Sequence, residues 1–396
     1  MSMLSITTAG EALKTFFLDS LRYQLNAKAS PVLAQLEQNS TSVVGKDIVM
    51  PLRYGRNGGF GGGADDGNLP AANSRKTKQA KWETKNLYAR IKITDKTMKA
   101  AKSNVGAFAN LFRLELEDSK EDAQQNLSRQ IFADGTGILC AISAVNSGAR
   151  LLTVPAEAIE IFAEGMLLDV HVANGTYRST AGSPIEVELV DEVNNQIRVS
   201  VFPAGTVATD LLCVQNSYAS EITGLKAIFD ATTLYGVVRA DYPWFNAQSI
   251  NVAGEISETK IQQGLDDSRR KAGGRINLLA CNFGVRRAYQ YLLQSQKRQV
   301  NTLDLKGGWT GLEYAGGDQR IGLVADMYAP KGSLIGLDTN DFKFYEIQDW
   351  DWMDQDGAVL SRIANKPAWE ATMIKYGDLG CQKPKAQVRL YGITEH

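Results

Sequence analysis

The longest regular pattern in the sequence is a helical repeat of apolar residues between Ser103 and Asp134. The apolar positions fall three, four or seven residues apart, which places them on one face of a helix. They are Val105, Phe108, Leu111, Phe112, Leu116, Ala123, Leu127 and Ile131. The polar face is an ordinary mix that includes Glu115, Glu117, Lys120 and Arg129. Ser103 or Asn104 can cap the start, and Asp134-Gly135 ends the helix because glycine readily adopts the left-handed conformation. At about 1.5 Å per residue this predicts a rod roughly 40 Å long.

An alternation of period two precedes this helix and predicts two strands, at Lys46–Tyr54 and Lys76–Thr94. Together they form a hairpin whose connecting loop is too rich in glycine to hold its own shape. The flexible tip contains Gly58, Gly59, Phe60, Gly61, Gly62 and Gly63. A two-stranded ribbon is marginally stable alone in water, so we expect it to lie against a neighbouring surface that gives it order.

The N-terminal residues predict a separate packing element. Residues Thr8–Leu25 have an amphipathic helical pattern with Leu13, Phe16, Phe17, Leu21 and Leu25 on one face. A short helix with so apolar a face needs a partner surface, which indicates that residues 1–45 are an arm that packs on something else.

The predicted secondary structure changes twice along the remainder of the chain. Ala158–Val214 is rich in short strands separated by turns, which predicts a small barrel or sandwich. Its strands are expected at Met166–Val172, Ile185–Val190, Ile197–Phe202 and Leu211–Val214. Gly224–Pro330 then alternates helix and strand, and Ser333–Ile393 returns to strands.

The alternating segment carries clear helix signals. Ser257 can cap a helix that runs to Lys271, and Gly273-Gly274 ends it. Ile276–Leu279 predicts a buried strand, and Asn282 can cap a second helix to about residue 299. This pattern predicts a compact α/β lobe.

Composition narrows the class of protein. The chain has 396 residues, 43 Lys plus Arg and 44 Asp plus Glu, so no global field draws it to nucleic acid or membrane. Cys140, Cys213, Cys281 and Cys381 lie far apart without metal-ligand spacing, which indicates buried thiols and a reducing compartment. No apolar stretch approaches the roughly 20 residues of a membrane helix.

Several motifs suggest chemistry that their context does not support. Gly59-x-Gly61-x-x-Ala64 follows a strand, but no helix begins there to bind a pyrophosphate. His171 and His396 are the histidines of the sequence, so a histidine-dependent site would rest on His171. The acidic run at 349–357 misses the spacing of a calcium loop. We predict no catalytic residue, no cofactor and no metal.

The order of these parts resembles the major capsid protein of tailed bacteriophages, the Hong Kong 97 fold. The segments that carry the resemblance are the hairpin running into the long helix at 84–135, then 224–230 with Tyr242-Pro-Trp244, then 311–316 with 324–326 and 330–332. The resemblance implies an α+β fold with an N-terminal arm, an extended β-hairpin loop, a long spine helix, a β-rich peripheral domain and an α/β axial domain.

The resemblance implies a division of the chain into six parts. The first three are an arm at 1–45, an extended hairpin loop at 46–96 and a peripheral domain with the spine helix at 97–159. The others are a β-rich inserted or elaborated module at 160–222, an axial domain at 223–332 and returning peripheral strands at 333–396. The chain begins at the arm, so we expect any scaffold to be a separate protein.

The function that the resemblance implies is self-assembly through hexamers and pentamers into an icosahedral shell around a double-stranded DNA genome. The implied location is the virion, after assembly in the host cytoplasm. Implied partners are further copies of the chain, scaffolding, portal and decoration proteins, and packaged DNA through non-specific contacts, with no membrane.

Two opposed charge runs support assembly independently. Residues 75–102 have ten basic and two acidic residues, and residues 338–356 have seven acidic and one basic. Complementary patches on a repeated chain favour head-to-tail contacts. The candidate contact residues are Lys81, Lys85, Arg90, Lys92, Asp349, Asp351 and Asp354. The alternative is two solvated faces that never meet.

Two other functions stay open at this stage. An encapsulin-like compartment has this fold class and encloses an enzyme in place of DNA. An enzyme on the α/β lobe would need a pocket with convergent polar groups and carboxylates of shifted pKa, which the sequence does not indicate.

Overall fold

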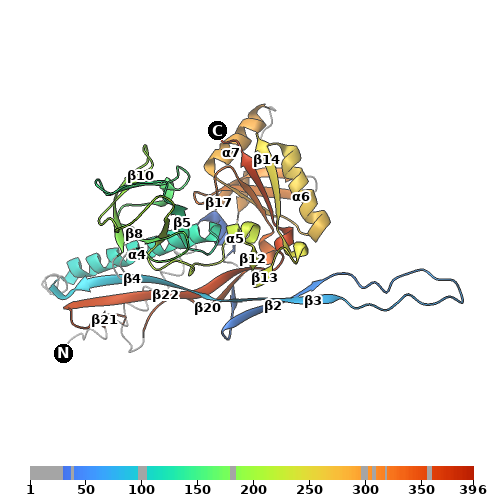
Figure 1. Ribbon diagram of the computed structural model, residues 1–396, viewed down its shortest axis with the longest axis horizontal. Helices are drawn as coiled ribbons and strands as arrows, with labels where there is room; N and C mark the ends of the chain where they lie inside the picture. Colours follow the sequence, from blue (N-terminus) through green and yellow to red (C-terminus); the bar gives the residue numbers. More distant parts are fainter. Residues whose placement is uncertain are drawn as a thin grey trace.

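The computed structural model describes residues 30–36, 40–96, 105–178, 184–295, 302–305, 309–316, 319–354 and 359–396. Figure 1 shows a flat sheet under a long helix, with a β-rich module and an α/β lobe above the helix and a hairpin extending to one side. The predicted helix at Thr8–Leu25 lies outside the described residues.

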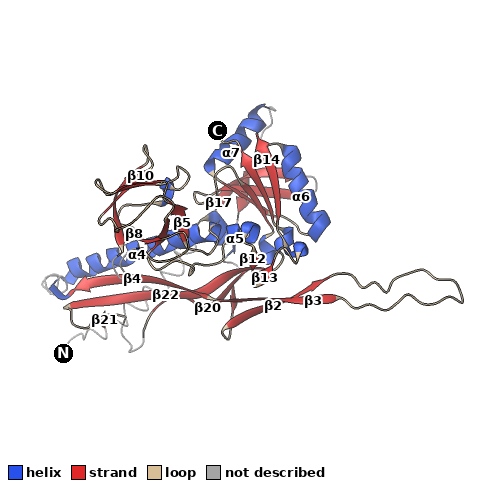
Figure 2. Cartoon of the chain, in the orientation of Figure 1, coloured by secondary structure: helices blue, strands red, loops and turns tan. Residues whose placement is uncertain are grey.

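The predicted long helix is present as α4 (Val105–Phe132). It ends where the sequence indicates, since Gly135 has φ of +80°. Leu127 and Ile131 are buried as expected. The prediction of a solvent-exposed polar face is wrong in part, however, because Lys120 and Arg129 are each only 7% exposed. Lys120 and Arg129 lie nine residues apart, on opposite faces of the helix. Figure 2 shows the β-rich module on one side of α4 and the flat sheet on the other, so α4 is enclosed on more than one face.

The flat sheet joins distant parts of the sequence. Its strands are β1 (Ser40–Ser42), β20 (Phe342–Trp352), β22 (Ala368–Cys381), β21 (Ser361–Arg362) and β4 (Lys85–Thr94). β22 pairs with β20 and β21 along the sheet and also with the whole of β4. Ile91 and Ile93 of β4 are buried, while Arg90 and Lys92 are exposed, which confirms the predicted alternation.

The predicted hairpin is correct for its first half. β2 (Asp47–Tyr54) pairs antiparallel with β3 (Lys76–Glu83) over eight residue pairs. The single strand predicted at Lys76–Thr94 is wrong, because the chain breaks at Thr84 and continues as β4. β4 leaves the hairpin because β22 offers it a ladder of ten residue pairs.

The β-rich module contains the predicted strands and others that precede them. Its sheet has the order β5-β11-β8-β9-β10-β7-β6 and curls around its own core. The strands are β5 (Ile138–Ala141), β6 (Ala144–Asn146), β7 (Leu151–Thr153), β8 (Leu167–His171), β9 (Ile185–Asp191), β10 (Gln196–Val199) and β11 (Leu211–Val214), with a 3-10 turn η2 at Ile159–Ile161. β5, β6 and β7 belong to this sheet although they lie before the predicted boundary at residue 160.

The α/β lobe has a sheet of order β14-β23-β19-β15-β18-β17-β16. These strands are β14 (Gln248–Gly254), β15 (Leu278–Cys281), β16 (Thr302–Leu305), β17 (Trp309–Gly316), β18 (Gln319–Ala325), β19 (Leu334–Leu337) and β23 (Val388–Ile393). Its helices are α6 (Glu258–Ala272) and α7 (Phe283–Ser295). β19 and β23 come from the predicted returning segment 333–396, so that segment contributes to both the lobe and the flat sheet.

The predicted helix signals in the lobe are confirmed. The side chain of Ser257 accepts a hydrogen bond from the backbone N–H of Lys260, and Gly273 ends α6 in the left-handed conformation. The Asn282 Oδ1 accepts a hydrogen bond from the Gly284 N–H at the start of α7.

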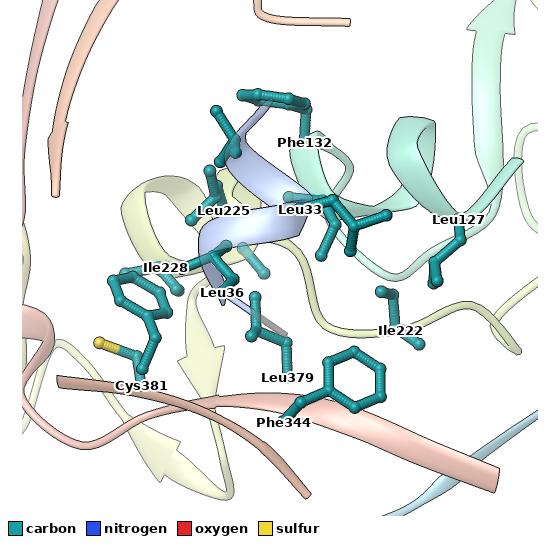
Figure 3. Close-up of a cluster of buried hydrophobic side chains, with 14 of the residues drawn as sticks. Leu33, Leu36, Leu127, Phe132, Ile222, Leu225, Ile228, Phe344, Leu379 and Cys381 are labelled. Carbon is teal, nitrogen blue, oxygen red and sulfur yellow. The ribbon is translucent and has the colours of Figure 1, made fainter. Parts of the chain in front are cut away.

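Short elements fill the space where the sheet, α4 and the lobe meet. They are α2 (Pro31–Leu36), α5 (Leu225–Asp230), β12 (Thr233–Leu234), β13 (Val237–Val238) and the 3-10 turns η3 (Pro243–Phe245), η4 (Thr339–Asp341) and η5 (Pro384–Ala386). Figure 3 shows Leu33 and Leu36 of α2 packed among Leu127, Leu225 and Leu379 from other elements. This is the principal core of the chain.

A short crossing segment, Glu221–Gly224, is fixed by polar contacts in this core. The buried Arg129 of α4 pairs with Glu221, and the Thr223 N–H and hydroxyl donate to Asp378 of β22 at 2.6 and 2.9 Å. A side chain at Gly224 would collide with the carbonyl oxygens of Gln130 and Ala133, so glycine alone fits this crossing. The segment therefore ties α4 to the sheet.

We expect Leu127→Ala to lower the free energy of unfolding by about 2 to 5 kcal/mol, because it empties a buried leucine site. Leu127 is 2% exposed. Denaturant unfolding of the purified subunit measures the change. Leu69→Ala is the matched control, since Leu69 is 91% exposed and its change should be close to zero. Equal stability of the two variants would contradict the burial of α4.

Asp378 should make the stability of the subunit depend on pH. Burial raises the pKa of Asp378 to about 7 from its ordinary value of 3.8. Because the folded pKa is the higher one, the stability from this group is complete below about pH 4 and is lost as the pH rises through about 7. Asn is uncharged throughout, so Asp378→Asn should gain stability relative to the wild type between about pH 5 and about pH 8. Denaturant unfolding of both proteins at about pH 5 and about pH 8 tests this. An equal difference in the free energy of unfolding at the two pH values would contradict it.

Candidate functional site

The hairpin of β2 and β3 projects from the body of the subunit, as Figure 1 shows. Its base belongs to the principal core, because Ile48, Leu52, Ala80 and Trp82 are all buried. The Trp82 ring lies 4.3 Å from the ring of Tyr235, measured between centroids. The expectation that the hairpin takes its order from a neighbouring surface is therefore wrong for its base, which is ordered by the core of its own subunit.

The end of the hairpin is different. Residues 55–75 form a loop without strands, and this loop contains the predicted tip Gly58–Gly63. Phe60 is 87% exposed and Leu69 is 91% exposed. Two large apolar side chains at the end of the projecting hairpin are therefore in contact with solvent.

The basic candidates lie along the hairpin and β4, and partners in the same subunit already engage several of them. Lys81 pairs with Asp47 at 2.9 Å, and Lys85 donates to the carbonyl oxygen of Ala219 at 3.2 Å. Arg90 pairs with Glu370 of β22. Hydrogen bonding to Asp47 raises the pKa of Lys81.

Lys92 has a different setting. It is exposed and lines a shallow cleft at the narrow end of the sheet, together with Lys96 and Lys366. Asp95 lines the same cleft, so three lysines and one aspartate gather at this end of the sheet.

The acidic candidates lie on and just after β20. Asp349 Oδ1 is 2.8 Å from the Nζ of Lys375, a buried lysine of β22. Asp351 accepts hydrogen bonds from Gln348 Nε2 at 3.3 Å and from the Trp352 N–H at 2.8 Å. Asp354, which follows β20, is half-buried.

β4, which carries part of the basic run, and β20, which carries part of the acidic run, thus lie in one sheet of the same chain, with β22 between them. Sequence reasoning missed Lys375 and Glu370, the residues of β22 that pair with the acidic and basic runs. Neither is part of a charge run, so a search for local charge excess could not have found them. The strand pairing is what places them opposite their partners.

The histidine and cysteine side chains considered for catalysis or metal binding are packed within the fold. His171 is buried, its ring stacks on that of Tyr218 at 4.4 Å, and its Nδ1 lies 3.1 Å from the Gly175 carbonyl oxygen. The cysteines are unpaired thiols, buried except for the half-buried Cys140, and burial raises the pKa of Cys213 to about 12. Within the described residues, no cluster of metal-ligating side chains occurs.

A cleft also lies beside the carboxyl ends of the parallel strands β15 and β18. It is lined by residues of α2, α4, α7 and β18, among them Gln124, Ser128, Arg286 and Asp326. Burial raises the pKa of Asp326. The sequence did not indicate this carboxylate, but the described lining has no histidine or cysteine beside it to act as a base or nucleophile.

None of the helices within the described ranges has the length and apolar character needed to cross a membrane.

No family model matches this sequence, and no curated protein matches it. Solved structures do match. A chain from the capsid asymmetric unit of cyanophage A-1(L) matches with a TM-score of 0.55 and 11% identity, over 92% of this chain and 93% of that one. The holo-SrpI encapsulin complex from Synechococcus elongatus PCC 7942 gives 0.47 and 8%, over 92% and 88%. The capsid of a native GTA particle gives 0.47 and 9%, over 92% and 90%. The chain therefore has the mixed α+β fold of the cyanophage A-1(L) capsid chain, which confirms the predicted Hong Kong 97-like fold.

Proposed function

We propose that this chain is a major capsid protein, which assembles through hexamers and pentamers into an icosahedral shell around the double-stranded DNA of a tailed bacteriophage. The observation that carries the proposal is the fold shared with the cyanophage A-1(L) capsid chain, which covers 92% of this chain and 93% of that one. The shared fold thus extends over most of both chains.

The projecting hairpin supports the same function. Its base is fixed in the core of its own subunit, while its tip exposes Phe60 and Leu69 to solvent. A rigid base with an exposed apolar tip suits an arm that reaches a neighbouring subunit. In this proposal the hairpin of β2 and β3 within residues 46–96 is the extended loop, β4 joins the flat sheet, α4 is the spine helix and the lobe is the axial domain.

Further assignments follow from the capsid role. Residues 1–45 act as the N-terminal arm and residues 160–222 fall in an elaborated β-rich module. Of residues 333–396, β20, β21 and β22 belong to the peripheral domain, while β19 and β23 belong to the lobe. Scaffolding, portal and decoration proteins are the expected partners, and DNA is contacted without sequence specificity. The protein is assembled in the host cytoplasm, resides in the virion and catalyses no reaction.

Ion pairs inside the subunit reduce the number of charged residues that are available for contact between subunits. Arg90 and Asp349 pair within their own chain, so their charges are partly compensated there. Within the described residues, Lys92 and Asp351 make no ion pair. We therefore place the electrostatic contact between subunits at Lys92 and Asp351.

Electron microscopy of the purified protein tests the function. The expected result is closed icosahedral particles or capsomer rings, and a monomer under all assembly conditions would refute it. The content of particles purified from the natural source decides between the shell types. DNA supports a phage capsid, whereas an enclosed enzyme would indicate an encapsulin-like compartment.

Replacing residues 58–68 by a short turn should prevent closed shells while leaving the subunit folded. β2 and β3 lie outside the deletion and keep their core contacts, so the circular dichroism spectrum should stay close to that of the wild type. Even about 1 to 2 kcal/mol lost per contact is multiplied over every interface of a shell. Particle yield is measured by sedimentation and microscopy. Shells of normal yield and heat resistance would refute a bonding role for the tip.

Assembly should weaken as salt rises, since exposed charge pairs are screened over about 8 Å at physiological ionic strength. Lys92→Glu should weaken it further, and Asp351→Lys in the same chain should partly restore it. Light scattering during assembly measures both effects. Glu192→Lys, an exposed reversal on the β-rich module, is the control. If Asp351→Lys did not restore assembly, Lys92 and Asp351 would not contact each other between subunits.

A further inference from the structure

Lys375 occupies an unusual position in the flat sheet. It lies on β22 in the row of alternate residues Ala371, Met373 and Leu379, all of which are buried in the principal core. Lys375 is itself only 2% exposed. Lysine is almost never buried to this extent unless it is paired, and an apolar residue would suit this row better. The lysine therefore needs an explanation beyond packing.

Its amino group lies among two carboxylates and an aromatic ring. The Nζ is 2.8 Å from Asp349 Oδ1 and 3.3 Å from Glu346 Oε2. It also lies 4.7 Å from the centre of the Phe344 ring. Both carboxylates come from β20, the strand paired with β22. The amine, an acyl group and a second carboxylate are thus brought together within contact distance.

The backbone of β20 is irregular at this point. The register shifts between Glu346 and Gln348 and again between Gln348 and Asp351. Gln348 pairs with Tyr376 and Asp351 pairs with Ile374, so Asp349 and Trp350 together stand opposite Lys375. Such bulges redirect side chains and are frequent next to reactive sites. Here the irregularity turns Asp349 toward Lys375 from a strand whose regular pairing would not aim it there.

We propose that Lys375 and Asp349 form an amide bond within the subunit, with Glu346 transferring the proton. The Lys375 nitrogen bonds to the Asp349 side-chain carbonyl carbon as one carbon–oxygen bond of that carboxyl group breaks. The ammonium and carboxylate together become one amide and one water, whose oxygen comes from Asp349. Glu346 takes a proton from the nitrogen and gives it to the departing oxygen. No oxidant, reductant or further reactant is required.

The surroundings favour this reaction over a permanent ion pair. Trp350 and Trp352 are buried on the same strand, and the Phe344 ring covers the amine. The Lys375 side chain is 3% exposed and the Asp349 side chain 38%, so burial disfavours the charged form of the amine above all. Moving one proton from the amine to Asp349 converts the ion pair into an amine and a carboxylic acid. Those uncharged forms are the ones that condense. The contact distance and fixed orientation replace the collision that free reactants would need.

The bond would join β20 covalently to β22 and so lock the strand that carries the acidic run to the centre of the flat sheet. Its formation concerns the folded subunit alone and does not depend on the proposed capsid function. The two proposals can therefore fail independently.

The mass of the denatured full-length protein tests the bond directly. The expected mass is that of the sequence less one water, and peptide mapping should find Asp349 and Lys375 in one branched peptide. Lys375→Met should have its full calculated mass. Lys366→Met, which replaces an exposed lysine at the end of the same sheet, should still lose the water.

Glu346→Gln tests the proton transfer, because it keeps both reacting groups. The folded variant should retain its full mass over a period in which the wild type reacts completely. A wild-type protein of full mass, before and after assembly, would show an ordinary buried ion pair and overturn the proposal. A water loss that maps to other residues would overturn it as well. Since the wild-type measurement decides the matter, a variant that does not fold cannot obscure the result.

Discussion

The structure depends on the pairing of β22, because this strand supplies a ladder to β4 and to β20 from the two ends of the sequence. Its fourteen residues also cover the principal core with Met373, Leu379 and Cys381. Sheets need several strands and an apolar face to be stable in water. β4 by itself follows a marginal hairpin, and β20 by itself carries a run of acidic residues. Both become part of a stable layer because β22 lies between them.

β22 also supplies residues that pair with both charge runs. Lys375 and Glu370 on β22 pair with Asp349 and Arg90, so part of the acidic and basic excess is compensated inside the subunit. Charges on neighbouring strands interact over a few ångströms, whereas charges on different subunits meet only after assembly and are screened by salt. The internal pairs are therefore the stronger ones.

The division between core and projection follows from burial. The base of the hairpin packs Trp82 against Tyr235 in the core, while Phe60 and Leu69 at the tip remain exposed. This gives the arm a fixed direction and an uncovered end. The crossing segment Glu221–Gly224 similarly ties α4 to β22 through Arg129 and Asp378. The chain is thus built as a packed body with one projecting hairpin whose tip is exposed.

Local patterns determined what the sequence could predict. The helical repeat placed α4 and ended it near Gly135, and the Ser257 and Gly273 signals bounded α6. Short runs separated by turns predicted β8 to β11 of the β-rich module. These features depend on neighbours a few residues away, which the sequence displays directly. The glycine-rich tip and the overall order of elements were predictable for the same reason.

Only the tertiary structure decided which strands pair and which charges meet. The break at Thr84, the membership of β19 and β23 in the lobe, and the burial of Lys120 and Arg129 all result from contacts between residues far apart in the chain. The placement of Lys375 beside Asp349 and Glu346 depends on the register and bulges of β20 against β22. A shift of one residue in that register would turn Lys375 to the other face of the sheet, so no local pattern could have indicated it.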